Sequence, residues 1–256
     1  MLYALAIGAG QTGEAADLPF VYESGLVVAP SFAVTLAFDD SWIDGAGIDL
    51  AQVLHGGLDV AFDAPLAPSG DVEIAPAIVG LDDKGPGKGA IILQETRIAQ
   101  NGALRAVVTS SLFVRGGGGF GGSTGRPAQL FRTPDRPPDA MREIATAANQ
   151  ALLFRLLGDR NPLHVDPAAA RAAGFDRPIL HGACTFGVAC LAVLREVCGL
   201  DPARLKRVAA RFAGVVYPGE TLLFSFWREG ATLAFRAQTR ERAAPALEGG
   251  LAEFSS

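Results

Sequence analysis

The segment RLLGDRNPLHVDP, Arg155 to Pro167, holds the residues best suited to chemistry. Asp159 and His164 lie five positions apart, with Asn161 between them. A carboxylate and an imidazole that share one water molecule can act as general acid and base. An arbitrary Asp and His more often cap a turn or complete a core, and this alternative stays open. All three histidines of the chain lie in the short motifs NPLH or LHG, which favours a functional role.

Two predicted helices hold this loop at its ends. The preceding stretch MREIATAANQALLFRLL, residues 141–157, has apolar residues at helical spacing. Pro162 cannot lie inside that helix, so Gly158 to His164 should form an irregular turn. After the loop, DPAAARAAG predicts a short helix with Asp166 as its N-cap and Gly174 at its end. The loop is therefore expected to be rigid.

The composition indicates a globular protein. The chain has 256 residues, of which 49% are apolar, and its 22 basic and 27 acidic side chains give a net charge of −5. This balance disfavours broad nucleic-acid binding, which normally needs a basic surface. The three cysteines lack metal or disulfide spacing. The N-terminus lacks a basic leader region, and the longest near-apolar run is too short to span a membrane. We expect a cytoplasmic protein that binds no metal, membrane or nucleic acid.

Two glycine-rich segments match the dinucleotide-binding pattern G-x-G-x-x-G. The first, GAGQTG at Gly8–Gly13, follows an apolar YALAI that could be a strand. The next strand-like run, LPFVYE, begins at Leu18, which is too near for a βαβ crossover. The second segment, GGGGFGGSTGRP, runs into proline-rich sequence and lacks G-K-[ST]. Both patterns therefore predict turns or loops, and no redox cofactor is expected.

The chain divides into two halves joined by a Gly- and Pro-rich stretch, residues 116–138. Each half contains the tripeptide LHG, at residues 54–56 and 180–182, followed by a Pro-Gly-type turn. The interval between LHG and the turn is 23 residues longer in the second half. It includes GACTFGVACLAVLREVC, residues 182–198, which predicts a helix buried on all sides. The first half lacks such a helix, so its sheet is expected to have an unfilled concave face.

Alternating apolar and polar residues predict an antiparallel sheet with one face buried. Strands are expected at residues 71–82, 90–99, 104–114, 207–217, 221–229, 232–240 and 247–254. Strands that follow a central helix indicate an α+β architecture.

At this point the sequence resembles a known family. The segment FRLLGDRNPLHVDPAAARAAGFDRPILHG resembles the signature of the MaoC-like (R)-specific enoyl-CoA hydratases, or hydratase 2. LHGGLDVAF, LDDKG, RFAGVVYPGE and WREG resemble the hydratase 2 segment of peroxisomal multifunctional enzyme type 2. The resemblance implies a double hot-dog fold whose antiparallel sheets wrap a central helix in the C-terminal half only. It implies an N-terminal domain at residues 1–122, a linker at 123–140 and a catalytic domain at 141–256.

The resemblance also implies roles for particular residues. Asp159 and His164 would activate the water that adds to C3 of a trans-2-enoyl-CoA, with Asn161 orienting that water. The N–H of Gly182 would bind the thioester oxygen as negative charge develops on it. The other implied substrate contacts are His55, Gly56, Lys84, Arg160, Pro162, Leu163 and Phe212. The product would be a (3R)-3-hydroxyacyl-CoA with a medium or long acyl chain. No cofactor is required, and the family implies a homodimer.

Other interpretations remain open at this point. The alternatives are a hot-dog acyl-CoA thioesterase, a dehydratase acting on carrier-protein substrates and a non-catalytic acyl-CoA binding subunit. A binding subunit would be expected to have lost part of the set Asp159, Asn161 and His164, which is complete here. His55 could be a remnant of the duplication, and Lys84 could be an ordinary solvated turn lysine. His181 is expected to support the loop rather than to react. Phe154 stands where a tyrosine is common in the family.

Overall fold

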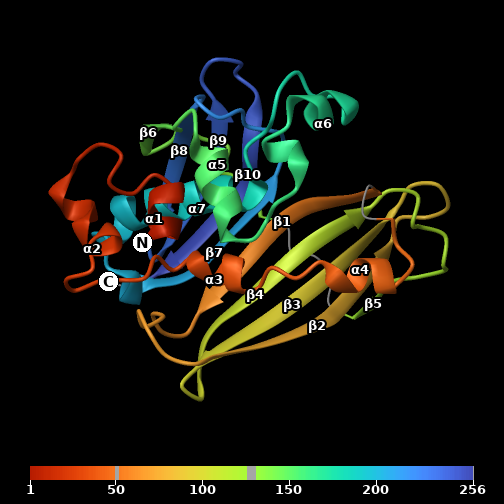
Figure 1. Ribbon diagram of the computed structural model, residues 1–256, viewed down its shortest axis with the longest axis horizontal. Helices are drawn as coiled ribbons and strands as arrows, with labels where there is room; N and C mark the ends of the chain where they lie inside the picture. The colour runs from red at the N-terminus through yellow and green to blue at the C-terminus, as the bar shows by residue number, and fades with distance from the viewer. Residues whose placement is uncertain (50–51, 126–130, 256) are drawn as a thin grey trace.

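The computed structural model describes residues 1–49, 52–125 and 131–255, and one antiparallel sheet of ten strands runs through them (Figure 1). The strands are β1 Val53–Phe62, β2 Val72–Asp83, β3 Ala90–Gln100, β4 Ala103–Val114, β5 Thr124–Gly125, β6 Ala140–Ala145, β7 Leu205–Phe212, β8 Thr221–Glu229, β9 Thr232–Thr239 and β10 Pro245–Phe254. The α-helices are α1 Leu2–Ala6, α2 Leu18–Val21, α3 Phe32–Leu36, α4 Ser41–Gly45, α5 Gln150–Phe154, α6 Pro167–Ala172 and α7 Gly182–Val193. The strand order across the sheet is β5-β2-β3-β4-β1-β7-β10-β9-β8-β6.

The two halves of the chain meet where β1 pairs with β7. Gly57 lies opposite Arg211 in this antiparallel pair. A Cβ at Gly57 would lie 2.7 Å from the carbonyl oxygen of Ala210, so the close approach of the strands requires glycine there. Each half contributes five strands to the continuous sheet. The expected α+β double hot-dog class is therefore confirmed.

Helix α7 is the central helix of the second half. Its residues Cys184–Val193 are all buried, as the apolar sequence predicted, and it contacts β7 and β10. A π-helical turn, Leu194–Cys198, continues it to the left-handed Gly199. Within the described residues, the first half has only helices of five residues or fewer. None of these helices is long enough to cross a membrane, and neither is α7.

The expectation of an unfilled concave face in the first half is wrong. Short helices α3 and α4 lie along this part of the sheet (Figure 1). The indole Nε1 of Trp42 donates to Oε1 of Gln94 on β3 at 2.9 Å, and the neighbouring Ile43 is 3% exposed. Ala33 and Val34 of α3 join the same hydrophobic core as Ile98. The sequence before β1 thus covers the face that a central helix would have filled.

The two strand-like runs near the N-terminus are helices, α1 and α2. The buried side chains of α1 pack on α7 at Gly187, where an added Cβ would lie 2.5 Å from Ile7 and 2.8 Å from the Tyr3 hydroxyl. Short apolar runs do not distinguish strand from helix, and here contact with α7 decided the outcome. The GAGQTG segment after α1 forms turns, as expected.

The prediction of one helix over residues 141–157 is also partly wrong. The first residues of this range form β6, the edge strand of the sheet, which pairs with β8. The helix α5 begins only at Gln150, and a 3₁₀ turn, Arg155–Leu157, continues it to the loop. The helical spacing of alanines was overridden because β8 offers unpaired backbone groups that residues 140–145 satisfy.

The two LHG tripeptides do not occupy equivalent places. Residues 54–56 lie within β1, whereas residues 180–182 lead into α7. In the sheet order, β1 and β7 occupy matching places in the two halves. The 23-residue difference was therefore counted between unlike positions, although the inference it supported, a central helix in the second half alone, is confirmed.

The second glycine-rich segment folds onto the turn between β2 and β3. The Asp83 carboxylate accepts hydrogen bonds from the N–H groups of Gly85, Gly119 and Gly121 at 2.7 to 2.8 Å. These bonds lower the pKa of Asp83 to about 2. A Cβ at Gly118 would lie 2.3 Å from the Gly89 oxygen, which explains the need for glycine in this loop. Part of the predicted linker, residues 126–130, lies outside the described residues.

An ion pair with a buried carboxylate connects the N-terminal segment to the π-helical turn after α7. Asp17 is fully buried, and its Oδ2 accepts from Arg195 Nη2 at 2.6 Å and from the N–H of Gly10 at 2.7 Å. We predict that Asp17→Ala lowers the free energy of unfolding by about 2 kcal/mol, because the partly buried Arg195 and the N–H of Gly10 both lose their acceptor. Urea unfolding measures this loss. Glu14→Ala, at an exposed position on the same segment, is the control, and equal effects of both variants would contradict the prediction.

Candidate active site

The loop that carries Asp159 is held by its own backbone and by two caps. Gly158 has φ +134°, a conformation that favours glycine, and directs the chain out of the preceding helical turn. The Asn161 side chain caps the 3₁₀ turn Pro162–His164 by accepting from the Leu163 N–H at 3.0 Å. Asp166 caps α6 as the sequence predicted, accepting from the Ala168 N–H at 2.7 Å. The expected irregular turn is confirmed.

Asp159 and His164 face each other across this loop. Oδ2 of Asp159 lies 4.0 Å from Nε2 of His164. A water molecule about 2.8 Å from both atoms fits between them. Nδ1 of His164 lies 2.8 Å from the Ile179 carbonyl oxygen, which can only accept, so Nδ1 carries the proton and Nε2 presents its lone pair to Asp159. Burial lowers the pKa of His164, so the imidazole is neutral at pH 7 and able to accept a proton.

His181 packs against His164 as a second, stacked imidazole. The two rings stack with centroids 3.7 Å apart, and the Phe154 ring covers His181 at 4.9 Å. Nε2 of His181 donates to the backbone carbonyl of Asp159 at 3.2 Å. Burial, followed by the neighbouring His164, lowers the pKa of His181 to about 3. His181 therefore supports the loop, as the sequence suggested.

The burial of His181 predicts a loss of stability in acid. The unfolded chain binds a proton on this imidazole below pH 6.5, whereas the folded chain does so only near pH 3. Between these pH values, proton binding to the unfolded chain lowers the free energy of unfolding, and this loss grows as the pH falls. Lowering the pH from 7 to 5 should cost about 2 kcal/mol through this residue. Urea unfolding of His181→Gln should show a pH-dependent loss smaller by that amount, and an unchanged loss would contradict the prediction.

Gly182 is the first residue of α7, so its N–H has no intrahelical partner and points outward at the positive end of the helix. A Cβ there would lie 3.3 to 3.4 Å from the ring of Phe212. The Phe212 ring in turn meets the His55 ring edge to face, with centroids 5.0 Å apart. The structure thus brings residues from both halves of the sheet together beside the Asp159 loop.

A groove of about 690 Å³ begins at His55, Gly56 and Phe212 and follows β1 toward Ala61. The groove lies on the face of the sheet opposite α7. Side chains alternate between the two faces along β1, and Leu58 and Val60 join the core around α7. Asp59, which lines the groove and pairs with Thr109 and Ala209, therefore faces away from α7. Its apolar wall includes Ile91, Leu93, Val107, Phe113 and Phe131.

The remaining residues implied by the resemblance lie around this arrangement. Gly56 stands at a bulge in β1, against the Ser111 carbonyl of β4. Arg160 and Pro162 are exposed on the loop, and Leu163 is half-buried. Lys84 follows β2 at the same end of the sheet as His55, and its ammonium pairs with Asp82. The structure does not bring Lys84 into the lining of the groove.

Three groups at the site have spacing that a metal ion could use. Ligand atoms of Asp159, His164 and His181 lie within 4.8 Å of one another. The two imidazoles are stacked with their planes 26° apart, so their in-plane lone pairs run side by side instead of converging on one point. This geometry suits proton transfer better than metal binding.

Sequence reasoning missed the groups that orient the candidate catalytic residues. The Ile179 carbonyl, which fixes the His164 tautomer, is a backbone atom and leaves no signal in the sequence. Phe154 was noted only as a departure from the family pattern, although its ring supports His181. The groove wall was missed because its residues come mainly from five strands, β3, β4, β1, β7 and β10, that become neighbours only in the sheet.

The sheet is built from two five-stranded halves, and the N-terminus of α7 lies beside the facing Asp159 and His164. These features define a double hot-dog protein of the MaoC-like class. The model of the MaoC like domain matches residues 130–248, and the model of the MFE-2 hydratase 2 N-terminal domain matches residues 1–116. The chain belongs to this family of two-domain MaoC-like hydratase 2 enzymes.

Individual relatives agree with this assignment. The chain is 41% identical to 3-hydroxyacyl-thioester dehydratase Y of Mycobacterium tuberculosis, covering 93% of this chain and 84% of the relative. It is 38% identical to the peroxisomal enoyl-CoA hydratase 2 of Arabidopsis thaliana, covering 97% and 86%. The crystal structure of a MaoC-like dehydratase from Phytophthora capsici matches with a TM-score of 0.89 at 35% identity, covering 100% and 91%.

Proposed function

We propose that this chain catalyses the reversible addition of water to trans-2-enoyl-CoA, giving the (3R)-3-hydroxyacyl-CoA. The observation that carries the proposal is the Asp159 carboxylate facing the unprotonated Nε2 of His164 at 4.0 Å, beside the N-terminus of α7. The names of the relatives support hydration or dehydration of acyl thioesters.

In this mechanism Asp159 and His164 together hold one water molecule. As the water oxygen bonds to C3, one of the pair accepts its proton, and the pair delivers a proton to C2, so that one water is added in total. Negative charge passes to the thioester oxygen during the reaction, and the N–H of Gly182 stabilises it with help from the helix dipole. Because Asn161 caps the loop with its side-chain oxygen, its NH₂ group is left to orient the water.

The test follows the loss of enoyl-thioester absorbance when purified protein is added to crotonyl-CoA and trans-2-decenoyl-CoA, with chiral analysis of the product. Formation of the (3R)-hydroxy product supports the proposal. Release of free CoA, detected by a thiol reagent, would instead indicate a thioesterase. Activity restricted to carrier-protein thioesters would indicate a carrier-dependent dehydratase. If no thioester is turned over, a non-catalytic acyl-CoA binding subunit is the remaining interpretation.

We also propose that the groove receives the acyl tail of a medium- or long-chain substrate. The tail would cross from the α7 side of the sheet to the groove beyond Gly57 and Arg211, where the pairing of β1 with β7 ends. From His55 to Ala61 it follows about 20 Å of strand, and its wall is mostly apolar. Lys84 follows β2, which lies three strand spacings, or about 14 Å, from β1. It lies at the end of the sheet near the Asp159 loop, and this position suits a contact between its ammonium group and a CoA phosphate.

A bulky side chain deep in the groove should distinguish substrates by length. Val107 pairs with Ala61 at the far end, so Val107→Trp should lower kcat/KM for trans-2-hexadecenoyl-CoA about tenfold by overfilling the groove. Turnover of crotonyl-CoA, whose chain is too short to reach this position, should stay within about twofold. Val107→Ala is the matched control. Equal losses for both substrates would place the acyl tail elsewhere.

A further inference from the structure

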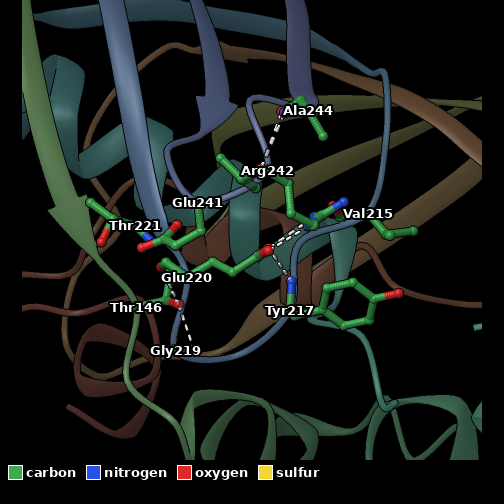
Figure 2. Close-up of polar contacts among 10 residues, drawn as sticks. Thr146, Val215, Tyr217, Gly219, Glu220, Thr221, Glu241, Arg242 and Ala244 are labelled. Atoms are coloured by element: carbon green, nitrogen blue, oxygen red, sulfur yellow. Dashed lines mark hydrogen bonds and ion pairs between the residues drawn. The ribbon is translucent and has the colours of Figure 1, made fainter. Parts of the chain in front are cut away.

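An ion pair between the buried Glu220 and the exposed Arg242 lies outside the site and connects to the two segments that lead into it, one before α5 and one before α7 (Figure 2). Glu220, which is 4% exposed, accepts from Nε and Nη2 of Arg242 and from the N–H of Tyr217 at 2.8 Å. Nη2 of Arg242 also donates to the Val215 carbonyl at 2.7 Å. The loop between β7 and β8 is therefore fixed at both Val215 and Tyr217 by one carboxylate–guanidinium pair.

This loop holds the segment that enters α7. Between the two fixed points, the Val216 carbonyl accepts from the Leu180 N–H at 2.7 Å, two residues before Gly182. Two guanidinium groups, those of Arg177 and Arg242, each lie 4.8 Å from the centroid of the Tyr217 ring. The segment from Arg177 to Gly182 is thus attached at two places, on either side of the carbonyl that orients His164.

The backbone of Glu220 also connects this ion pair to the segment that leads into α5. The Glu220 carbonyl accepts from the Thr146 N–H at 3.0 Å and from its hydroxyl at 2.7 Å, and that hydroxyl accepts from the Gly219 N–H at 3.0 Å. Thr146 begins the turn that leads into α5 and from there to the Asp159 loop.

We infer that Glu220 and Arg242 are positioning residues for the reaction: their ion pair, acting through Val216 and Leu180, holds the Gly182 N–H where it meets the thioester oxygen. This inference rests on the proposed role of Gly182. A buried carboxylate with a forked guanidinium partner suits this task because two parallel hydrogen bonds fix an orientation that a single charge does not.

The first test compares Arg242→Gln with wild type on crotonyl-CoA. We expect kcat to fall about tenfold with KM changed by less than about twofold, because the interaction is lost mainly in the transition state. Arg242→Lys, which keeps the charge and one bond, should lose less. The control is Arg240→Gln, which breaks the exposed pair with Glu143 in the same region and should leave kcat unchanged. A loss of folded protein with unchanged kcat per folded molecule would overturn the inference.

A double-mutant cycle tests the route. If Arg242 acts through the Gly182 N–H, Arg242→Gln should lower kcat by less than about twofold in a Gly182→Pro background, where that N–H is absent. A full tenfold loss in this background would overturn the route. Should the wild-type protein hydrate no thioester, the proposed function fails separately, and amide exchange decides the inference. The Leu180 amide should exchange faster in Arg242→Gln than in Arg240→Gln, and equal exchange would overturn it.

Discussion

Asp159→Asn should lower kcat for hydration by about 100-fold or more while leaving the fold intact. The amide cannot take a proton from water, so His164 would have to act alone on a water held less firmly. The side chain is about a quarter exposed, and one of its oxygens accepts only the Asn161 N–H at 3.2 Å, a bond that an amide oxygen can keep. Stopped-flow absorbance at saturating crotonyl-CoA measures kcat.

The fold control for this variant is its unfolding curve, which should match that of wild type within about 0.5 kcal/mol. Asp166→Asn, a substitution at the cap of α6 in the same loop region, should retain near wild-type turnover. A variant Asp159→Asn with most of its activity would remove Asp159 from acid–base chemistry.

Gly182→Pro should also lower kcat by about 100-fold, because it removes the N–H proposed to stabilise the thioester oxygen. The backbone accommodates this change. Gly182 is the first residue of α7, a position where proline is favoured, and His181 before it has φ −58° and ψ 137°, which are angles that a residue preceding proline adopts.

Gly182→Ala is the matched control for this substitution. It adds a Cβ at 3.3 to 3.4 Å from the Phe212 ring but keeps the N–H, so it reports the steric cost alone. We expect alanine to lower kcat by no more than a few-fold, and proline to lower it far more with little change in KM. Equal losses in both variants would show that crowding at Phe212 is responsible.

The loop that carries Asp159 and His164 was easier to predict from the sequence than the elements around it. Its irregular turn was predicted correctly because proline and capping residues determine local geometry in any context. Strands β2, β3, β8 and β9 were placed nearly to their ends, since alternation of apolar and polar residues reports a sheet with one buried face.

The failures have a common physical cause. Residues 141–145 and the first residues of α1 are short segments whose conformation depends on the neighbour that they meet, β8 in one case and α7 in the other. The cover over the first half's sheet was missed because α3 and α4 are too short to show a period. No local pattern shows that Glu220 and Arg242, 22 residues apart, form an ion pair whose carboxylate is buried.

The pairing of β1 with β7 also constrains how the protein folds during synthesis. The first half is made without its partner strand, so β1 leaves the ribosome with one row of backbone groups unsatisfied until β7 arrives much later. Contacts this distant in the sequence carry a large loop-closure entropy and form slowly. Because His55 and Phe212 meet only across that seam, catalytic competence should be the last property the nascent chain acquires.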